Sequence, residues 1–594
     1  MTGTGSAARS FSTMRAVVSC ETPVPWLVGA TLATVALAPS LLGGVVNLDG
    51  VGSVEMAVVG VMEAMTVLVW ASGRDALPRP ASRVLAVLVA AWVAAMVAAT
   101  VAAIDVAPAV VRTTSWLVHL AFATVVWAEA RHGRTAAAEH GAVAGFVVTA
   151  VLVVWAWFGL PDVEASQSWG GAVPLVGNIR LASIYGLVGA TFGAQALVRT
   201  APAWRPGLLA AAVCTLGWAA LWWGGSRGAL AGAVLASALL VRVAQGRRWP
   251  VAGVLALCAG LGAALSLALF IDVPYAGLWR FMPGVPRFAP GVAGFTAGRT
   301  SLWATAVEAW LGRPWLGRGP GATVSLMAPM GHMHVHNVGL QALVEWGVLG
   351  ALPFAALAAM VLARAVQIRR DGPAGAAAYL LALATVSVFD GVTSHTGPTV
   401  IGLCAAALVL AAPRDRVAVG LVHGWTGGRR TLTAVALLGL AVFAVHLVVL
   451  RAVWAPGTPA PGSARARLVL AVPTYAPAKE IEGWGRTWMR TDPAAAERLV
   501  RWGLALERNP WLFLRLRGDL ARQRGDLDAA LADYCAAAEG RARLAAGFDR
   551  YLGQSAPTAC VSERDAPGLQ TPSARRYLAP PPAAPAAPSA TPNG

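Results

Sequence analysis

The residues best suited to chemistry gather in one stretch, Arg299–Gly350, of an otherwise apolar chain. Within it, His332, His334 and His336 alternate with apolar residues and are followed by Asn337. If this segment is extended, the three imidazoles share one face, because side chains alternate along a strand. They could then bind a metal ion. Alternatively, a neutral histidine could act as a general base, with Asn337 orienting the ring or the substrate.

No Asp, Glu or Cys lies close enough in sequence to complete or orient a metal shell around these histidines. A general base is therefore favoured over a metal site, and we expect neither a metal ion nor another cofactor. A hydrated loop with incidental histidines is the remaining alternative. Glu345, inside the helix that follows, is expected to be a packed, hydrogen-bonded structural carboxylate.

Two arginines stand where apolar helices are expected to begin. Arg227, in GGSRGAL, lies between two spans with almost no loop between them. It could anchor to lipid head groups or bind a phosphate by bidentate hydrogen bonds. Arg299 begins a helix with an apolar stripe that is expected to lie in the membrane interface. Its charge is the wrong sign for a helix start, so it either faces an anion or is solvated.

Three further arginines are weaker candidates for substrate contacts. Arg313 and Arg318 belong to the turn RPWLGRGPG, whose glycines could expose backbone N–H groups to an anion. Arg180, in GNIRLAS, lies in an earlier loop expected on the same side of the membrane and could add a positive contact.

The composition predicts a protein that crosses a membrane many times. Of 594 residues, 57% are hydrophobic and only 13% are charged, against roughly 25% charged in soluble proteins. The mean hydropathy is +0.61. The net charge of +17 is almost entirely arginine, placed between apolar runs rather than in one basic patch. This pattern is typical of topology signals and argues against a nucleic-acid partner.

About thirteen apolar runs are candidate spans, which predicts an all-α, polytopic helical membrane domain over residues 23–453. We expect them near Pro23–Leu42, Val54–Ala71, Val84–Val106, Ala109–Ala128, Gly141–Leu160, Leu181–Val198, Leu208–Gly224, Ala229–Val243, Val251–Ile271, Val338–Leu362, Ala376–Phe389, Thr399–Leu410 and Leu432–Val453.

Every second connection is rich in arginine, and these connections must share one side. The positive-inside rule makes that side the cytoplasm. The long connection 272–336 then faces outward, as does the C-terminal tail, because the number of spans is odd. Residues 1–22 are expected to be a disordered cytoplasmic lead.

The tail follows a linker, expected at 454–491, and is expected to form a small helical extracytoplasmic domain at 492–552. Gly518, Ala530, Tyr534 and Ala537 have spacings like those of a tetratricopeptide repeat, which would suit a protein partner. A generic helical hairpin is the alternative. Residues 577–594 are rich in Pro and Ala and expected to be disordered. Cys535 and Cys560 could form a disulfide in this outward part.

Three motifs, in order and on one expected side, resemble the O-antigen ligase and O-antigen polymerase superfamily. HNVGLQALVEWGVLG (His336–Gly350) resembles its signature, in which an HN pair starts a transmembrane helix and a Glu-x-Gly follows. GRTSLWATAVEAWLGRPWLGRGPG (Gly298–Gly321) is similar to the segment that precedes it. GGSRGAL (Gly224–Leu230) resembles the family's Ser-Arg-Gly span start. The match is specific over about 224–362, and earlier spans agree only in hydropathy.

The resemblance implies a glycosyltransferase at the outer face of the cytoplasmic membrane. The donor would be a polyprenyl-diphosphate-linked glycan and the acceptor a glycan, lipid or protein hydroxyl. Arg227 and Arg299 would bind the diphosphate leaving group, and His336 would deprotonate the acceptor. Arg180, Arg313, Arg318, His334 and Asn337 are candidate substrate-binding residues. Such enzymes look inverting and metal-independent, with arginines supplying the electrostatic stabilisation.

Two other functions stay open. A transporter or flippase of lipid-linked glycan would place charged residues along a path through the spans and show an internal repeat, and neither is clear in the sequence. A membrane scaffold that recruits partners through its tail would not need Arg227, Arg299 or His336. Ligase, polymerase and protein O-oligosaccharyltransferase are not separated, and neither the sugar nor the oligomeric state is indicated.

Overall fold

The structure, a computed structural model, describes residues 23–49, 53–73, 77, 82–159, 179–200, 204–269, 299–327, 334–412, 426–471, 478–506 and 510–537. These residues form helices joined by turns, and no β-strand occurs among them. The all-α class expected from the sequence is therefore confirmed.

Each expected span corresponds to a helix, but within the described part of the chain nine helices, and not thirteen, are long and apolar enough to cross a membrane. The helices at the spans expected near Pro23–Leu42, Ala229–Val243, Ala376–Phe389 and Thr399–Leu410 are not among the nine. The helices of this membrane unit are α2 (Val24–Asp49), α3 (Ser53–Ser72), α4 (Arg83–Val101), α5 (Val106–Arg131), α6 (Ala136–Gly159), α7 (Ile179–Thr200), α8 (Trp204–Gly224), α9 (Arg227–Val243), α10 (Arg248–Leu269), α12 (Arg299–Leu311), α13 (Ala322–Met327), α14 (Val338–Val366), α15 (Ala374–Ser387), α16 (Thr396–Ala411), α17 (Thr426–Trp454) and α18 (Ala464–Ala471).

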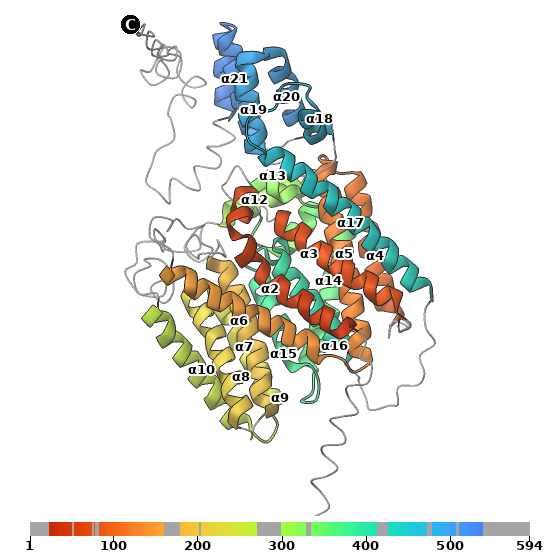
Figure 1. The fold of residues 1–594 in the computed structure, drawn as a ribbon, viewed down its shortest axis with the longest axis vertical. Coiled ribbons are helices and arrows are strands. Elements are labelled where there is room, and N and C mark those ends of the chain that lie inside the picture. Colours follow the sequence, from red (N-terminus) through yellow and green to blue (C-terminus); the bar gives the residue numbers. More distant parts are fainter. Residues whose placement is uncertain are drawn as a thin grey trace, which may run out of the picture. The chain divides into compact units, whose positions relative to one another are not determined.

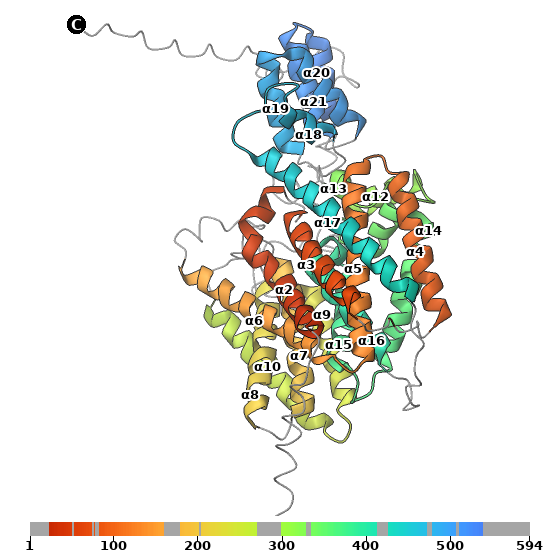
Figure 2. The same cartoon turned by 45° about the vertical axis from the view of Figure 1, so that its right-hand side comes forward.

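Several helices of the membrane unit pack side by side. In Figure 1, α7 lies beside α8, and α8 beside α10. Helix α9 packs against α15, α5 against α3 and α16, and α4 against α14, as Figure 2 also shows for the last pair. Small residues allow some of these approaches, since a Cβ on Gly141 of α6 would lie 2.1 Å from the Gly29 carbonyl oxygen of α2.

Arginines near the ends of α7, α9, α14 and α17 bind main-chain carbonyls of neighbouring segments. Arg364 donates from Nη2 to the Ala412 carbonyl at 2.7 Å, and Arg199 donates to the Gly372 carbonyl at 3.1 Å. Arg242 and Arg429 bind the carbonyls of Val366 and Ala71 in the same way. The carbonyls of Ala71, Val366 and Ala412 lie at helix carboxyl ends, where such cations satisfy orphan carbonyls and suit the negative end of the helix dipole. The contacts of Arg199, Arg242 and Arg364 bring the carboxyl ends of α7, α9 and α16 to the carboxyl end of α14 and the turn that follows it.

A second, separate unit contains α19 (Ala478–Thr491), α20 (Pro493–Ala505), α21 (Pro510–Gln523) and a further helix at 527–537. Gly518 meets Tyr534 closely, because a Cβ there would lie 2.7 Å from the tyrosine ring and 3.2 Å from the Ala530 carbonyl oxygen. Three of the four residues with repeat-like spacing, Gly518, Ala530 and Tyr534, thus lie close together across a helical hairpin.

The tail's expected boundaries are only partly covered by this unit. Helices α18 and α19 fall inside the segment expected to be a linker, 454–491. Cys560 and the segments expected to be disordered, 1–22 and 577–594, lie outside the described residues. The Cys535–Cys560 disulfide therefore stays a prediction.

Candidate functional site

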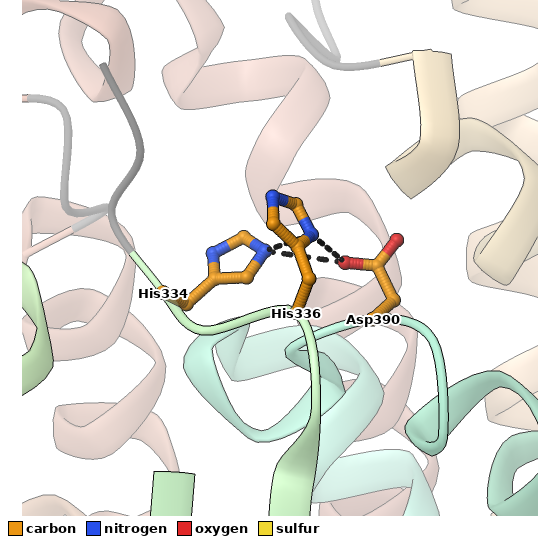
Figure 3. A group of neighbouring side chains, drawn as sticks. All are labelled: His334, His336 and Asp390. Carbon is orange, nitrogen blue, oxygen red and sulfur yellow. Dashed lines mark hydrogen bonds and ion pairs between the residues drawn. The ribbon is translucent and has the colours of Figure 1, made fainter. Parts of the chain in front are cut away.

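The candidate site is built where α14 begins and where α15 connects to α16. His336 Nδ1 lies 2.9 Å from Asp390 Oδ1, and His334 Nε2 lies 3.1 Å from the same oxygen. The two imidazole nitrogens are 3.0 Å apart. Figure 3 shows both rings turned toward the carboxylate, with the second nitrogen of His336 on the side away from Asp390. All three side chains are buried, with no more than 5% of each residue exposed.

Asp390 is held as an anion in this cluster. It lies in the connection between α15 and α16, outside both helices. Burial alone would raise the pKa of its carboxyl, but hydrogen bonds from His334 and His336 hold that pKa well below its usual range. The Gly391 N–H also donates to Asp390 Oδ1 at 2.9 Å. Because an ionised carboxylate only accepts hydrogen bonds, the facing nitrogen of His336 carries the proton.

A third histidine lies beside this cluster. The His395 ring meets the His334 ring edge-on, with 5.3 Å between centroids. Burial, followed by the charges of His334 and Arg112, lowers the pKa of His395 to about 4, although Asp390 acts in the opposite direction. His395 is therefore neutral near pH 7 and contributes a polar ring rather than a charge.

The backbone at His336 is strained. Its φ is 55°, and within the described residues no other non-glycine residue has a positive φ. This turn departs from the extended segment expected from the alternating histidines, yet it still brings His334 and His336 to one carboxylate. Asn337 then caps α14, because its Oδ1 accepts the Leu340 N–H at 2.9 Å and its Nδ2 donates to the Val388 carbonyl at 3.0 Å. Backbone strain of this kind costs about 1–3 kcal/mol and gathers at functional sites. His332 lies outside the described residues.

The glycine-rich turn has a structural partner, which corrects the expectation that its N–H groups are offered to an anion. The N–H of Arg318 donates to the Val344 carbonyl at 2.7 Å, and that of Gly319 to the Glu345 carbonyl at 3.1 Å. Helix α14 is interrupted at Gly347, with φ 60° and ψ −169°, and the turn fills this break. The N–H of Val348 in turn donates to the Pro314 carbonyl at 2.8 Å. The N–H groups of Arg318 and Gly319 are therefore already hydrogen-bonded within the protein.

Gly347→Ala should destabilise the protein by about 3 kcal/mol or more. A Cβ there would sit 2.3 Å from the Trp315 carbonyl carbon, at a φ that L side chains rarely adopt. The measurement is thermal unfolding in detergent. Gly253→Ala in α10 is the matched control, because a Cβ there meets nothing within 4 Å, and this change should stabilise by about 0.5–1 kcal/mol. Equal melting temperatures for the two variants would contradict the role of Gly347.

Glu345 is the structural carboxylate that the sequence predicts. It is buried, and its Oε1 accepts the Thr323 hydroxyl at 2.6 Å and the Gln341 Nε2 at 3.1 Å. Gln341 Oε1 accepts the Ser394 hydroxyl at 3.0 Å. Glu345 therefore ties α13 to α14 and, through Gln341, to the connection that carries Asp390.

The two arginines assigned to phosphate binding are both first residues of helices. Arg227 begins α9 and is exposed, and the Ser226 side chain caps this helix. A Cβ on Gly228 would lie 3.8 Å from Cβ of Phe389, so the start of α9 adjoins the residue before Asp390. Arg299 begins α12, is partly buried, and α12 packs against α14.

The weaker arginine candidates occupy different positions. Arg313 is exposed and donates from Nη1 to the Ala102 carbonyl at the end of α4, at 3.1 Å, so it also has a structural contact. Arg318 is partly buried in the glycine turn. Arg180 belongs to the first turn of α7 and not to a loop, which corrects its expected placement.

Two residues of the cluster were missed from the sequence: Asp390 and His395. In the sequence, Asp390 directly follows the expected span Ala376–Phe389. A usable signal existed, because the polar run DGVTSH, from Asp390 to His395, lies in a short connection that the span count places on the same side as His336. No carboxylate lies close to the histidines in sequence, and Asp390 reaches them from 54 residues away.

The cluster also has the geometry of a possible metal site. His334, His336 and Asp390 each offer one ligand atom, separated by 2.9–3.1 Å. Ligands at right angles around an ion, with bonds of about 2.1 Å, would be about 3.0 Å apart. The residues therefore fit a divalent ion. A metal on Nδ1 of His336 would leave the proton on Nε2, so metal ligation and a general-base role for that nitrogen exclude each other.

Comparison with known proteins shows a similarity over part of this site. Residues 210–355 match the family model described as O-antigen ligase. A comparison with curated proteins found no match. The matched segment runs from α8 through the first part of α14 and contains Arg227, Arg299, the glycine turn and His336. It covers all three motifs that carried the resemblance, though not the repeat-like tail. Over residues 210–355 the chain is thus similar to the O-antigen ligase family.

Proposed function

We propose that the chain transfers a glycan from a polyprenyl-diphosphate donor to an acceptor hydroxyl at the outer face of the cytoplasmic membrane. The O-antigen ligase family supports a glycosyl-transferring enzyme embedded in a membrane. The observation that carries the finer proposal is the buried His336–Asp390 pair at 2.9 Å, formed at the one strained non-glycine residue of the described chain.

In this proposal His336 is the general base. Asp390 holds the Nδ1–H tautomer, so Nε2 is the nitrogen that takes the acceptor's proton, and the carboxylate stabilises the imidazolium that results. The acceptor oxygen forms a bond to the anomeric carbon as the bond from that carbon to the phosphate oxygen breaks. A single displacement of this kind inverts the anomeric configuration. Polyprenyl diphosphate leaves with the electron pair.

Arg227 and Arg299 are proposed to stabilise the charge that develops on the diphosphate. Each stands at the amino end of a helix, where the dipole and exposed N–H groups also favour an anion. The candidates for further substrate contacts remain Arg180, Arg313, Arg318, His334 and Asn337. Three of them, Arg313, His334 and Asn337, already make hydrogen bonds within the protein and would contact the substrate in addition.

The test is a reconstituted transfer assay. Proteoliposomes receive an undecaprenyl-diphosphate-linked oligosaccharide as donor. The acceptors are a second glycan, a lipid-linked sugar and a serine- or threonine-containing peptide, tested in parallel. Glycan on one acceptor, lost in folded His336→Ala and Arg299→Ala, would support the enzyme and identify its class. Donor that only crosses the bilayer would favour a transporter. Variants as active as wild type would reject the assigned residues.

Metal independence is a separate prediction. Activity should survive EDTA treatment and dialysis into metal-free buffer, because His336 uses Nδ1–H toward Asp390 and needs Nε2 as an acceptor of the proton. Loss of transfer that Mg²⁺, Mn²⁺ or Zn²⁺ restores would instead assign His334, His336 and Asp390 to a metal site.

The orientation in the membrane is likewise proposed from the arginine pattern. An alkaline phosphatase fusion after Trp454 should be active, because the tail is expected outside the cytoplasm. A silent fusion there, together with an active fusion after Arg370, would invert the topology. An outward tail with tetratricopeptide-like hairpins would be placed to bind a protein partner or a large acceptor.

A further inference from the structure

Arg112 is a cation inside the membrane unit that the proposed reaction does not use directly. It lies about two turns into α5, partly buried, and its Nη2 donates to the Thr393 carbonyl. Its Nη1 lies 3.7 Å from the sulfur of Met56 in α3. A Cβ on Gly321 of the glycine turn would stand 3.8 Å from Cβ of Arg112. The guanidinium thus joins α5 to the connection between α15 and α16, and Arg112 lies close to the glycine turn.

The segment that Arg112 holds carries the acidic half of the candidate site. Thr393 belongs to the short helix η5 (Val392–Ser394), which stands between Asp390 and His395. Asp390 orients His336 from one end of this segment, and His395 contacts His334 from the other. Any shift of the Thr393 backbone would be transmitted to both contacts.

The charge of Arg112 is balanced from two other helices. It interacts electrostatically with Glu345 of α14 and Glu55 of α3, both of which are buried. A charged residue inside a membrane bundle is costly and is retained where it has a specific task. A guanidinium suits this place, because its planar set of donors can hold a carbonyl while its charge offsets the two carboxylates.

We infer that Arg112 is a positioning residue of the site: its hydrogen bond to the Thr393 carbonyl fixes the Asp390–His395 segment so that Asp390 faces His336. This inference rests on the proposed function for its kinetic consequence, because misplacing the carboxylate misplaces the base. Arg112 is not expected to affect donor binding, because Arg227 and Arg299 lie on other helices, α9 and α12.

The test compares Arg112→Gln and Arg112→Lys with Arg364→Gln as the matched control. Arg364 also binds one main-chain carbonyl of a neighbouring helix, that of Ala412. It lies in the last turn of α14, whereas the candidate site lies at the start of that helix. Arg112→Gln should lower kcat about 100-fold, the scale expected when a reacting group is displaced by about 1 Å. KM for the undecaprenyl-diphosphate donor should stay within about twofold of wild type. Arg112→Lys should recover at least about tenfold of the kcat loss, and Arg364→Gln should keep wild-type kcat.

A second readout does not depend on activity. Labelling of His336 and His395 by diethyl pyrocarbonate, measured by mass spectrometry, should be faster in Arg112→Gln than in wild type or Arg364→Gln. An unchanged kcat and labelling rate in Arg112→Gln would overturn the inference, as would an equal kcat loss in Arg364→Gln. If wild type transfers no glycan but the labelling difference holds, the proposed function fails and the anchoring role of Arg112 stands.

Discussion

His336→Ala is expected to lower kcat for glycan transfer by about 1,000-fold or more while the protein stays folded. General base catalysis typically contributes 10²–10⁴-fold. The alanine variant removes the imidazole that lies 2.9 Å from Asp390, and with it the proposed base. The donor should still bind, since Arg227 and Arg299 are untouched. Initial rates of transfer at saturating donor, with binding measured separately, check this expectation.

Companion variants separate chemistry from folding. His336→Asn should be as inactive as the alanine variant yet at least as stable, because asparagine tolerates the positive φ of 55° found there. Asp390→Asn should also be nearly inactive, because the amide favours the wrong imidazole tautomer. His140→Ala, an exposed histidine at the start of α6, should retain full activity. An active His336→Asn would rule out the base.

The second large effect is expected at the arginines that begin α9 and α12. Arg227→Ala and Arg299→Ala should each lower kcat/KM by about 10²–10³-fold, because preorganised cationic donors at a developing charge are worth that much. Lysine at either position should recover only part of the loss, since it cannot form a bidentate contact with phosphate. Steady-state kinetics with the polyprenyl-diphosphate donor measure kcat and KM for each variant.

The control for the arginine variants is an exposed arginine in a different connection. Arg370 is exposed in the connection after α14, and Arg370→Ala should leave kcat/KM unchanged. Raising the salt concentration should weaken donor binding in wild type more than in either alanine variant, because exposed charge pairs are screened. Wild-type kcat/KM in both alanine variants would place the diphosphate elsewhere.

The helices, and the place of His336 just before one of them, were predictable because their signals are local. Apolar runs of sufficient length define α3, α5 or α14 without knowledge of their neighbours. The Ser-Arg-Gly and His-Asn motifs likewise mark helix starts, with Ser226 and Asn337 acting as caps. What lies within one segment could be read from that segment alone.

The remaining parts of the site depend on contacts between distant segments. Asp390 reaches His336 only because the α15–α16 connection returns to the start of α14. The glycine turn looked like an anion cradle because its partner, the break at Gly347, is invisible in a continuous apolar run. Arg112 resembled any polar residue near the start of a span, since the Thr393 carbonyl that it binds lies 281 residues away.

The most direct test of the account is the chemical identity of the lipid product, measured by mass spectrometry during a single turnover of wild type and His336→Asn. The account predicts that wild type releases intact polyprenyl diphosphate in equal amount to glycosylated acceptor. It predicts that His336→Asn leaves the donor bound and uncleaved. Release of polyprenyl diphosphate by both proteins at the same rate would contradict the role of His336. Donor recovered whole from wild type, with its glycan still attached, would contradict glycan transfer itself.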